Sequence, residues 1–109
     1  MMLDLEPTAI FCCNDLMAMG AVNACQRMGR RVPQDISVIG YDNTALSQYT
    51  APKLTTIDQN MGDLGRAAAR LMLKQIEEDV TENVMLANTV VERETTGFRV
   101  EENFEGGFV

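Results

Sequence analysis

The sequence is 109 residues long, carries a formal net charge of −7 and is 46% hydrophobic, which suits a single globular domain. It contains no apolar run long enough for a membrane-spanning helix and no basic stripe of the kind that binds nucleic acid. Its start, MMLDLEPT, lacks the pattern of a secretory signal, so we expect a cytoplasmic protein without membrane contact.

The first part of the chain predicts a strand, a helix and a second strand. The apolar run TAIFCCN, residues 8–14, is typical of a strand buried on both faces of a parallel sheet. LMAMGAVNACQRMG, residues 16–29, is rich in helix formers, and Gly29 indicates where that helix ends. ISVIGYD, residues 36–42, is the second predicted buried strand.

The second part continues this alternation. After a polar connection with room for one helical turn, the β-branched residues of LTTIDQ, residues 54–59, favour a third strand. Apolar residues then recur at steps of three and four from Met61 to Ile76, as on one face of a helix. NVMLANTVVERETT, residues 83–96, predicts one or two further strands.

Strands that alternate with helices indicate an α/β fold with right-handed crossovers. We therefore predict a three-layer arrangement, with a mostly parallel sheet and flanking helices. We expect one domain over residues 1–100, followed by a flexible tail over 101–109.

Three predicted strands end in polar pairs: Asn14-Asp15, Asp42-Asn43 and Asp58-Gln59. The carboxyl ends of parallel strands meet at one edge of a sheet, and α/β folds bind ligands there. Carboxylates and amides at such an edge suit a ligand with several hydroxyl groups. The competing interpretation is structural. We expect Asp15 to cap the helix that follows, Asn14 fits either role, and the other pairs could be turn or capping residues.

The sequence offers little for catalysis or metal binding. It has no histidine, and Cys12, Cys13 and Cys25 do not follow a zinc-ligand spacing. No G-x-G-x-x-G, Walker or G-x-S-x-G motif occurs. We expect buried, reduced thiols, no metal, no cofactor and no enzymatic activity. A cysteine enzyme is a distant alternative.

The predicted helix after Asn14 is apolar over most of its circumference. Its apolar side chains do not fit one narrow stripe: Leu16, Met17, Met19, Val22, Cys25 and Met28. Such a helix is typically buried on two sides, by its own sheet and by a second subunit. The alternative is that the methionines only fill the core of their own subunit.

Residues 7–97 resemble the C-terminal part of the lactose/galactose repressor (LacI/GalR) family. The matching motifs occur in one order with little gap: PTAIFCCND with MAMGA at 7–21, VPQDISVIGYDN at 32–43, P-x-LTTIDQ at 52–59, LG-x3-A from Leu64, and VERETT at 91–96. The resemblance implies a periplasmic-binding-protein-like core of two subdomains with an effector held in the cleft between them. This chain would then be a fragment that forms most of the C-terminal subdomain.

The resemblance also implies roles for particular residues. The family's effector contacts fall on Asn14, Asp42 and Gln59, so Asp42 would accept hydrogen bonds from a small molecule. A polar residue at position 14 is common in sugar-responsive members, in contrast to the purine-responsive type, so the expected effector is a sugar. The family's dimer interface falls on one helix and one later segment, here represented by Leu16, Met17, Met19, Val22 and Tyr49.

The function implied is that of a transcriptional regulator. Effector binding would control operator DNA binding by an N-terminal helix-turn-helix domain that is absent from this chain, and the protein would form a homodimer or a higher oligomer. The alternative is a periplasmic-type sugar-binding protein for transport, which shares the fold. The absent signal and the specific matches at LTTIDQ and RETT favour the regulator.

Overall fold

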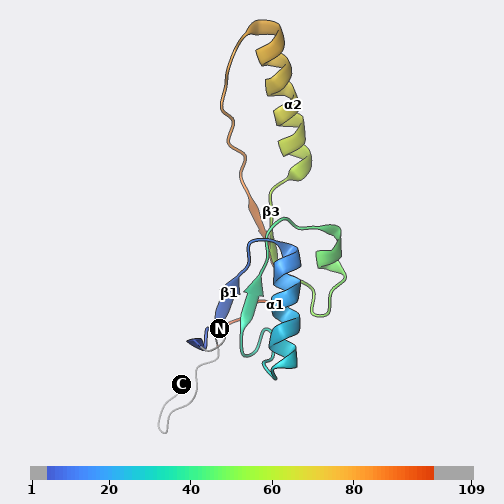
Figure 1. Ribbon diagram of the computed structural model, residues 1–109, viewed down its shortest axis with the longest axis vertical. Helices are drawn as coiled ribbons and strands as arrows, with labels where there is room; N and C mark the ends of the chain where they lie inside the picture. Colours follow the sequence, from blue (N-terminus) through green and yellow to red (C-terminus); the bar gives the residue numbers. More distant parts are fainter. Residues whose placement is uncertain (1–4, 100–109) are drawn as a thin grey trace.

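The computed structural model describes residues 5–99 (Figure 1). Its strands and helices occur in the predicted order, and the strands are shorter than predicted. The four strands are β1 (Ala9–Phe11), β2 (Ser37–Ile39), β3 (Thr56–Asp58) and β4 (Thr89–Val91). The helices are α1 (Asp15–Arg27), a single 3-10 turn η2 (Ala45–Gln48) and α2 (Met61–Glu78). The 3-10 turn lies in the connection where one helical turn was expected.

The body of the fold is a parallel pair of strands covered by α1. β1 and β2 are parallel neighbours, with Ile10 beside Val38, and a parallel bridge from Ile39 to Thr55 joins β2 to the segment that leads into β3. The core lies between these strands and α1 and consists of Ile10, Ala18, Val22, Cys25, Val32, Ile36, Val38 and Leu54. Parallel pairing of the first strands is therefore confirmed.

Local signals account for both ends of α1. Asn14 is the N-cap, and its side-chain Oδ1 accepts a hydrogen bond from the backbone nitrogen of Met17 at 2.8 Å. The helix stops at Met28, and Gly29 follows with φ of +79°, a conformation that glycine adopts without a steric cost. The expectation that Asp15 caps the helix is wrong, because Asp15 lies one residue inside it and its side chain is buried.

The last strand is antiparallel to its neighbour, in a sheet predicted to be mostly parallel. β4 is antiparallel to β3, with Ile57 opposite Val90. After α2 the chain returns along an extended segment to the same end of β3 that it left, so the two strands pair in opposite directions (Figure 1). β3 and β4 thus form an antiparallel pair of their own, beside the parallel pair of β1 and β2.

Helix α2 stands apart from the body and points away from α1 and β1 (Figure 1). Of its residues only Ala67 is buried. Its predicted apolar stripe is real but exposed, with Met61 at 59%, Met72 at 58% and Ile76 at 71% exposure. No described part of the chain covers this stripe, so the predicted three-layer arrangement stays a prediction.

The segment after β4 returns to the body. The backbone nitrogen of Val38 donates to the carbonyl of Thr95 at 2.8 Å, and the Thr95 hydroxyl donates to the carbonyl of Val38 at 2.6 Å. The same hydroxyl accepts from the backbone nitrogen of Thr55 at 2.9 Å. Thr95 thereby ties the end of the chain to both β2 and the approach to β3. The tail predicted over 101–109 lies outside the described residues.

Candidate functional site

Backbone hydrogen bonds align the three polar strand ends at one edge of the body. The backbone nitrogen of Cys12 donates to Ile39 at 2.9 Å, and that of Asp15 donates to Tyr41 at 3.0 Å. One segment further along, the backbone nitrogen of Asp42 donates to the carbonyl of Ile57 at 2.9 Å. These bonds put the segments that carry Asn14, Asp42 and Gln59 next to one another.

Asp42 and Gln59 meet directly at this edge. The Gln59 Nε2 donates to the Asp42 Oδ1 at 2.5 Å, and both side chains are half-buried. The second carboxylate oxygen of Asp42 receives no hydrogen bond from the described residues. Asp42 has φ of +119°, which L-residues rarely adopt, so the turn holds this side chain in an unusual direction. The pair combines an acceptor oxygen with an amide that is already oriented.

Asn14 combines two roles at the same edge. Its Oδ1 is used in the helix cap described above, which leaves the Nδ2 group as a donor. Its side chain is half-buried. The structural and ligand-binding interpretations of Asn14 are therefore compatible, because they use different atoms.

Asn43 has a structural role, because it bonds to Arg93. The sequence patterns did not identify Arg93. Asn43 Oδ1 accepts from Arg93 Nη2 at 2.7 Å, while its Nδ2 donates to Asp58 Oδ2 at 3.3 Å. Arg93 Nη1 also donates to the Ser47 hydroxyl and the Leu54 carbonyl, each at 2.8 Å. Arg93 thereby fastens the turn after β2 to the segment after β4. No local signal marks it, because Arg93 is one charged residue in the run VERE.

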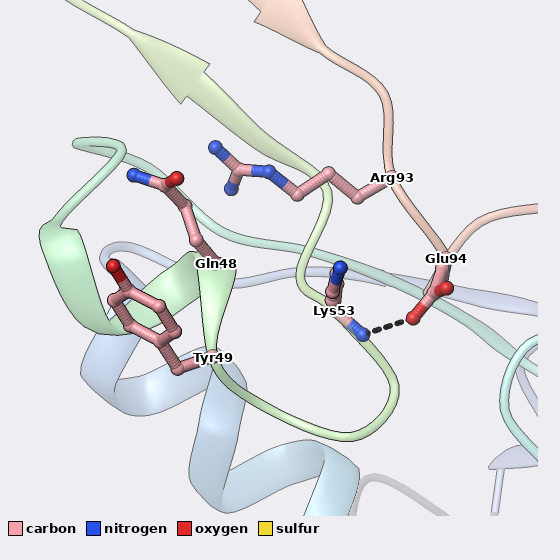
Figure 2. Close-up of a pocket in the computed structure, with 5 residues that line it drawn as sticks. All are labelled: Gln48, Tyr49, Lys53, Arg93 and Glu94. Atoms are coloured by element: carbon pink, nitrogen blue, oxygen red, sulfur yellow. Dashed lines mark hydrogen bonds between the residues drawn. The ribbon is translucent and has the colours of Figure 1, made fainter.

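The hollow in Figure 2 does not lie at the strand edge but beside the Arg93 side chain. It has a volume of about 690 Å³ and is lined by Gln48, Tyr49, Lys53, Arg93 and Glu94. The backbone nitrogen of Lys53 donates to Glu94 Oε1 at 2.8 Å (Figure 2). None of Asn14, Asp42 and Gln59 lines this hollow. We nevertheless place the candidate site at the strand edge, where Asp42 and Gln59 are in contact. A surface that forms only one wall of a cleft does not enclose a cavity by itself, so the site need not coincide with the hollow.

The five residues expected at a dimer interface differ in exposure. Leu16, Met17 and Tyr49 are 74%, 57% and 78% exposed. Met19 is half-buried against the core, and Val22 belongs to the core itself. Met19 and Val22 also line a shallow apolar groove of about 200 Å³ between α1 and the segment from Thr50 to Leu54. Leu16, Met17 and Tyr49 do not line this groove, and the role of the five residues as an interface stays a prediction.

The expectation of buried thiols holds for Cys25 but not for Cys13, which is exposed, and both Cys12 and Cys25 are poorly suited to nucleophilic chemistry. Burial raises the pKa of the Cys12 thiol, and the nearby Cys13 and Cys25 thiols raise it further. Burial likewise raises the pKa of Cys25. A thiol with a raised pKa is protonated near neutral pH and attacks slowly.

Residues 5–99 contain neither a metal-binding cluster of side chains nor a helix that could span a membrane. Within that range no group of three or more Cys, Asp or Glu side chains is placed to hold a metal ion. No helix of the same range has both the length and the apolar character needed to cross a membrane.

Comparison with known proteins agrees with this geometry. Residues 1–96 match the family model of the periplasmic binding protein-like domain. A curated relative from Pasteurella multocida, an HTH-type transcriptional repressor named PurR, is 48% identical over 83 residues, which are 76% of this chain and 25% of the relative. The chain thus spans about a quarter of the length of the curated relatives that it matches. Those relatives are named as HTH-type transcriptional repressors.

Solved structures give the same picture. The lac repressor dimer bound to operator and the anti-inducer ONPF is 40% identical, with a TM-score of 0.80 over 85% of this chain and 33% of its own. A LacI family regulator from Enterococcus faecium with bound ribose is 37% identical, with a TM-score of 0.78 over 87% of this chain and 36% of its own. The complex of the regulator CelR with cellobiose is 34% identical, with a TM-score of 0.78 over 85% of this chain and 30% of its own.

Proposed function

We propose a function from the premise that this chain belongs to the periplasmic binding protein-like domain family, in the form found in LacI/GalR-type transcriptional regulators. The chain forms one wall of an effector-binding cleft, and the gene product that contains it is a repressor whose operator affinity depends on the effector. The direct contact between Asp42 and Gln59 at the strand edge, next to Asn14, is the observation that carries this proposal.

The effector that we propose is a sugar. Asp42 has one oxygen held by Gln59 and a second that receives no bond from the described residues, so it can accept from a hydroxyl group. The Nδ2 group of Asn14 can donate to another hydroxyl. Similar regulators have been solved with bound ribose and in complex with cellobiose, which supports a sugar in the matching cleft.

The second wall of the cleft belongs to another part of the gene product. The exposed apolar stripe of α2 supports this, because side chains such as Met72 and Ile76 need a covering surface. We propose that the same part packs against α2 and completes the third layer. Effector binding then favours one arrangement of the two walls, and a ligand shifts this equilibrium only by its differential affinity for the two states. A coupling of ~1–3 kcal/mol is typical.

Calorimetric titration of the gene product that contains this chain tests the effector class. Ribose, lactose and cellobiose are compared with the purine bases adenine and guanine. We expect one of the sugars to bind and to change operator affinity in a DNA-binding assay. Binding of a purine alone would overturn the sugar assignment and leave the repressor function in place. If an effector binds without any effect on DNA, the transport protein that shares this fold becomes the better description.

We also propose that the protein forms a homodimer through α1 and the segment around η2. Leu16 and Met17 on α1 and Tyr49 after η2 are large apolar side chains left in contact with water, and the groove between α1 and residues 50–54 offers a further apolar surface. A repressor acts on DNA, so we place this dimer in the cytoplasm.

A charged side chain at position 49 tests the dimer. Tyr49→Asp places a carboxylate in an apolar contact, and we expect it to raise the dimer dissociation constant by at least ~100-fold, as for a hot-spot aromatic residue. Analytical ultracentrifugation measures this change. Phe98→Asp, at another exposed aromatic residue outside this surface, is the control and should leave the dimer intact. A monomeric wild-type protein would contradict the proposal.

A further inference from the structure

The side chain of Asp15 is almost fully buried, at 1% exposure, yet no described cation contacts it. Its Oδ2 accepts from the backbone nitrogen of Thr44 at 2.6 Å and from the Thr44 hydroxyl at 2.9 Å. Its Oδ1 accepts from the Thr56 hydroxyl at 2.5 Å. Such a carboxyl group is costly to bury unless donors satisfy it, and here three donors from two distant segments do so.

The three bonded residues lie beside the three proposed effector contacts. Asp15 directly follows Asn14, Thr44 lies two residues after Asp42, and Thr56 lies three residues before Gln59. The Thr56 hydroxyl also accepts from the backbone nitrogen of Asn43 at 3.2 Å, inside the turn that carries Asp42. One buried carboxyl group therefore links the start of α1, the turn after β2 and the first residue of β3.

We propose that Asp15, acting through Thr44 and Thr56, is a positioning residue that sets the spacing of Asn14, Asp42 and Gln59. Asp42 and Asn43 both have positive φ, at +119° and +58°, so this turn needs tertiary contacts to keep its conformation. The inference rests on the proposed function for its consequence in effector binding. The geometry of the edge can be measured without any effector.

The Thr56 hydroxyl offers a matched pair of variants. Thr56→Val keeps the shape of the side chain and removes its donor to Asp15, while Thr56→Ser keeps the hydroxyl and loses a methyl group. We expect Thr56→Val to weaken binding of the sugar found by titration about tenfold or more, as for a buried carboxyl group that loses a donor, and Thr56→Ser to stay within about threefold of the wild type. Asp15→Asn should resemble Thr56→Val, because an amide has one acceptor oxygen and cannot accept from both Thr44 and Thr56 as the two carboxylate oxygens do.

The NMR chemical shift of the Gln59 side-chain amide tests the positioning role, because a general loss of stability does not change it. In the gene product labelled with 15N-glutamine, Gln59→Glu identifies the side-chain amide signal of Gln59 by removing it. We expect that signal to shift in Thr56→Val, because the bond to Asp42 is lost or lengthened, and to keep its position in Thr56→Ser. Val38→Ala, which destabilises the core away from this edge, is the control and should not shift it.

The outcomes separate the two proposals. A shifted Gln59 signal together with weaker sugar binding supports both. A shifted signal in a protein whose wild type binds no sugar supports the positioning role and overturns the proposed effector class. An unchanged signal in Thr56→Val, or an equal shift in Val38→Ala, overturns the positioning role whether or not a sugar binds.

Discussion

Asp42→Asn is expected to weaken effector binding by about 10- to 100-fold, which corresponds to the ~1.5–3 kcal/mol of a hydrogen bond to a charged group. Asparagine keeps the size of the side chain, and it tolerates positive φ better than alanine does. Its Oδ1 can still accept from Gln59, so the internal contact survives. What is lost is the second acceptor oxygen that faces the proposed ligand. Calorimetric titration of both proteins with the same sugar measures the difference.

Operator binding separates a ligand contact from a folding role. In the effector-free state, Asp42→Asn should bind operator DNA as tightly as the wild type does, and only the response to effector should be lost. Asp63→Asn is the matched control: it removes one negative charge from α2, where Asp63 is exposed and pairs with Arg66. It should change neither property. An equal loss of effector and operator binding in Asp42→Asn would point to a folding role for Asp42.

The sequence predicts the order of elements well because the signals are local. The step of three and four from Met61 to Ile76 correctly places α2, since helical periodicity depends only on neighbouring turns. The same pattern says nothing of where the helix lies, and α2 in fact stands away from the body (Figure 1). The sequence assigned no direction to β4 for a related reason, because a strand pattern has no direction.

At the candidate site too, local sequence signals identify residues but do not identify their contacts in space. The polar ends of the strands identify Asn14, Asp42 and Gln59, and the structure brings Asp42 and Gln59 into contact. The roles of the adjacent Asn14 and Asp15 could not be assigned locally, because both residue types cap helices well. Asp15 is buried by partners 29 and 41 residues away, and those contacts decide that Asn14 is the cap.

Gly40 follows β2, and we expect an added side chain to destabilise the protein more there than at any other small residue of the body. A Cβ atom added there would lie 2.5 Å from Asp15 Oδ1, 3.0 Å from Leu54 Cδ2 and 3.2 Å from Ala18 Cβ. Asp15 cannot move aside freely, because Thr44 and Thr56 hold its carboxyl group. Gly40→Ala should therefore lower the free energy of unfolding by about 1–3 kcal/mol through overpacking.

Urea unfolding of Gly40→Ala beside Gly20→Ala measures this effect. Gly20 lies inside α1 with nothing within 4 Å of an added Cβ, so alanine there should stabilise the protein by about 0.5–1 kcal/mol through the helix backbone. Equal effects at the two glycines would contradict the crowded contact at Gly40.

The double variant Asp15→Ala with Gly40→Ala then identifies the source of the crowding. Without the Asp15 carboxyl group the added methyl group has room beside the end of β2, so Gly40→Ala should cost less in that background than alone. Residues in direct contact typically show a coupling of about 0.5–3 kcal/mol in such a cycle. Additive effects would mean that Leu54 and Ala18 cause the strain, and that the turn carrying Asp42 does not depend on a tight fit between Gly40 and Asp15.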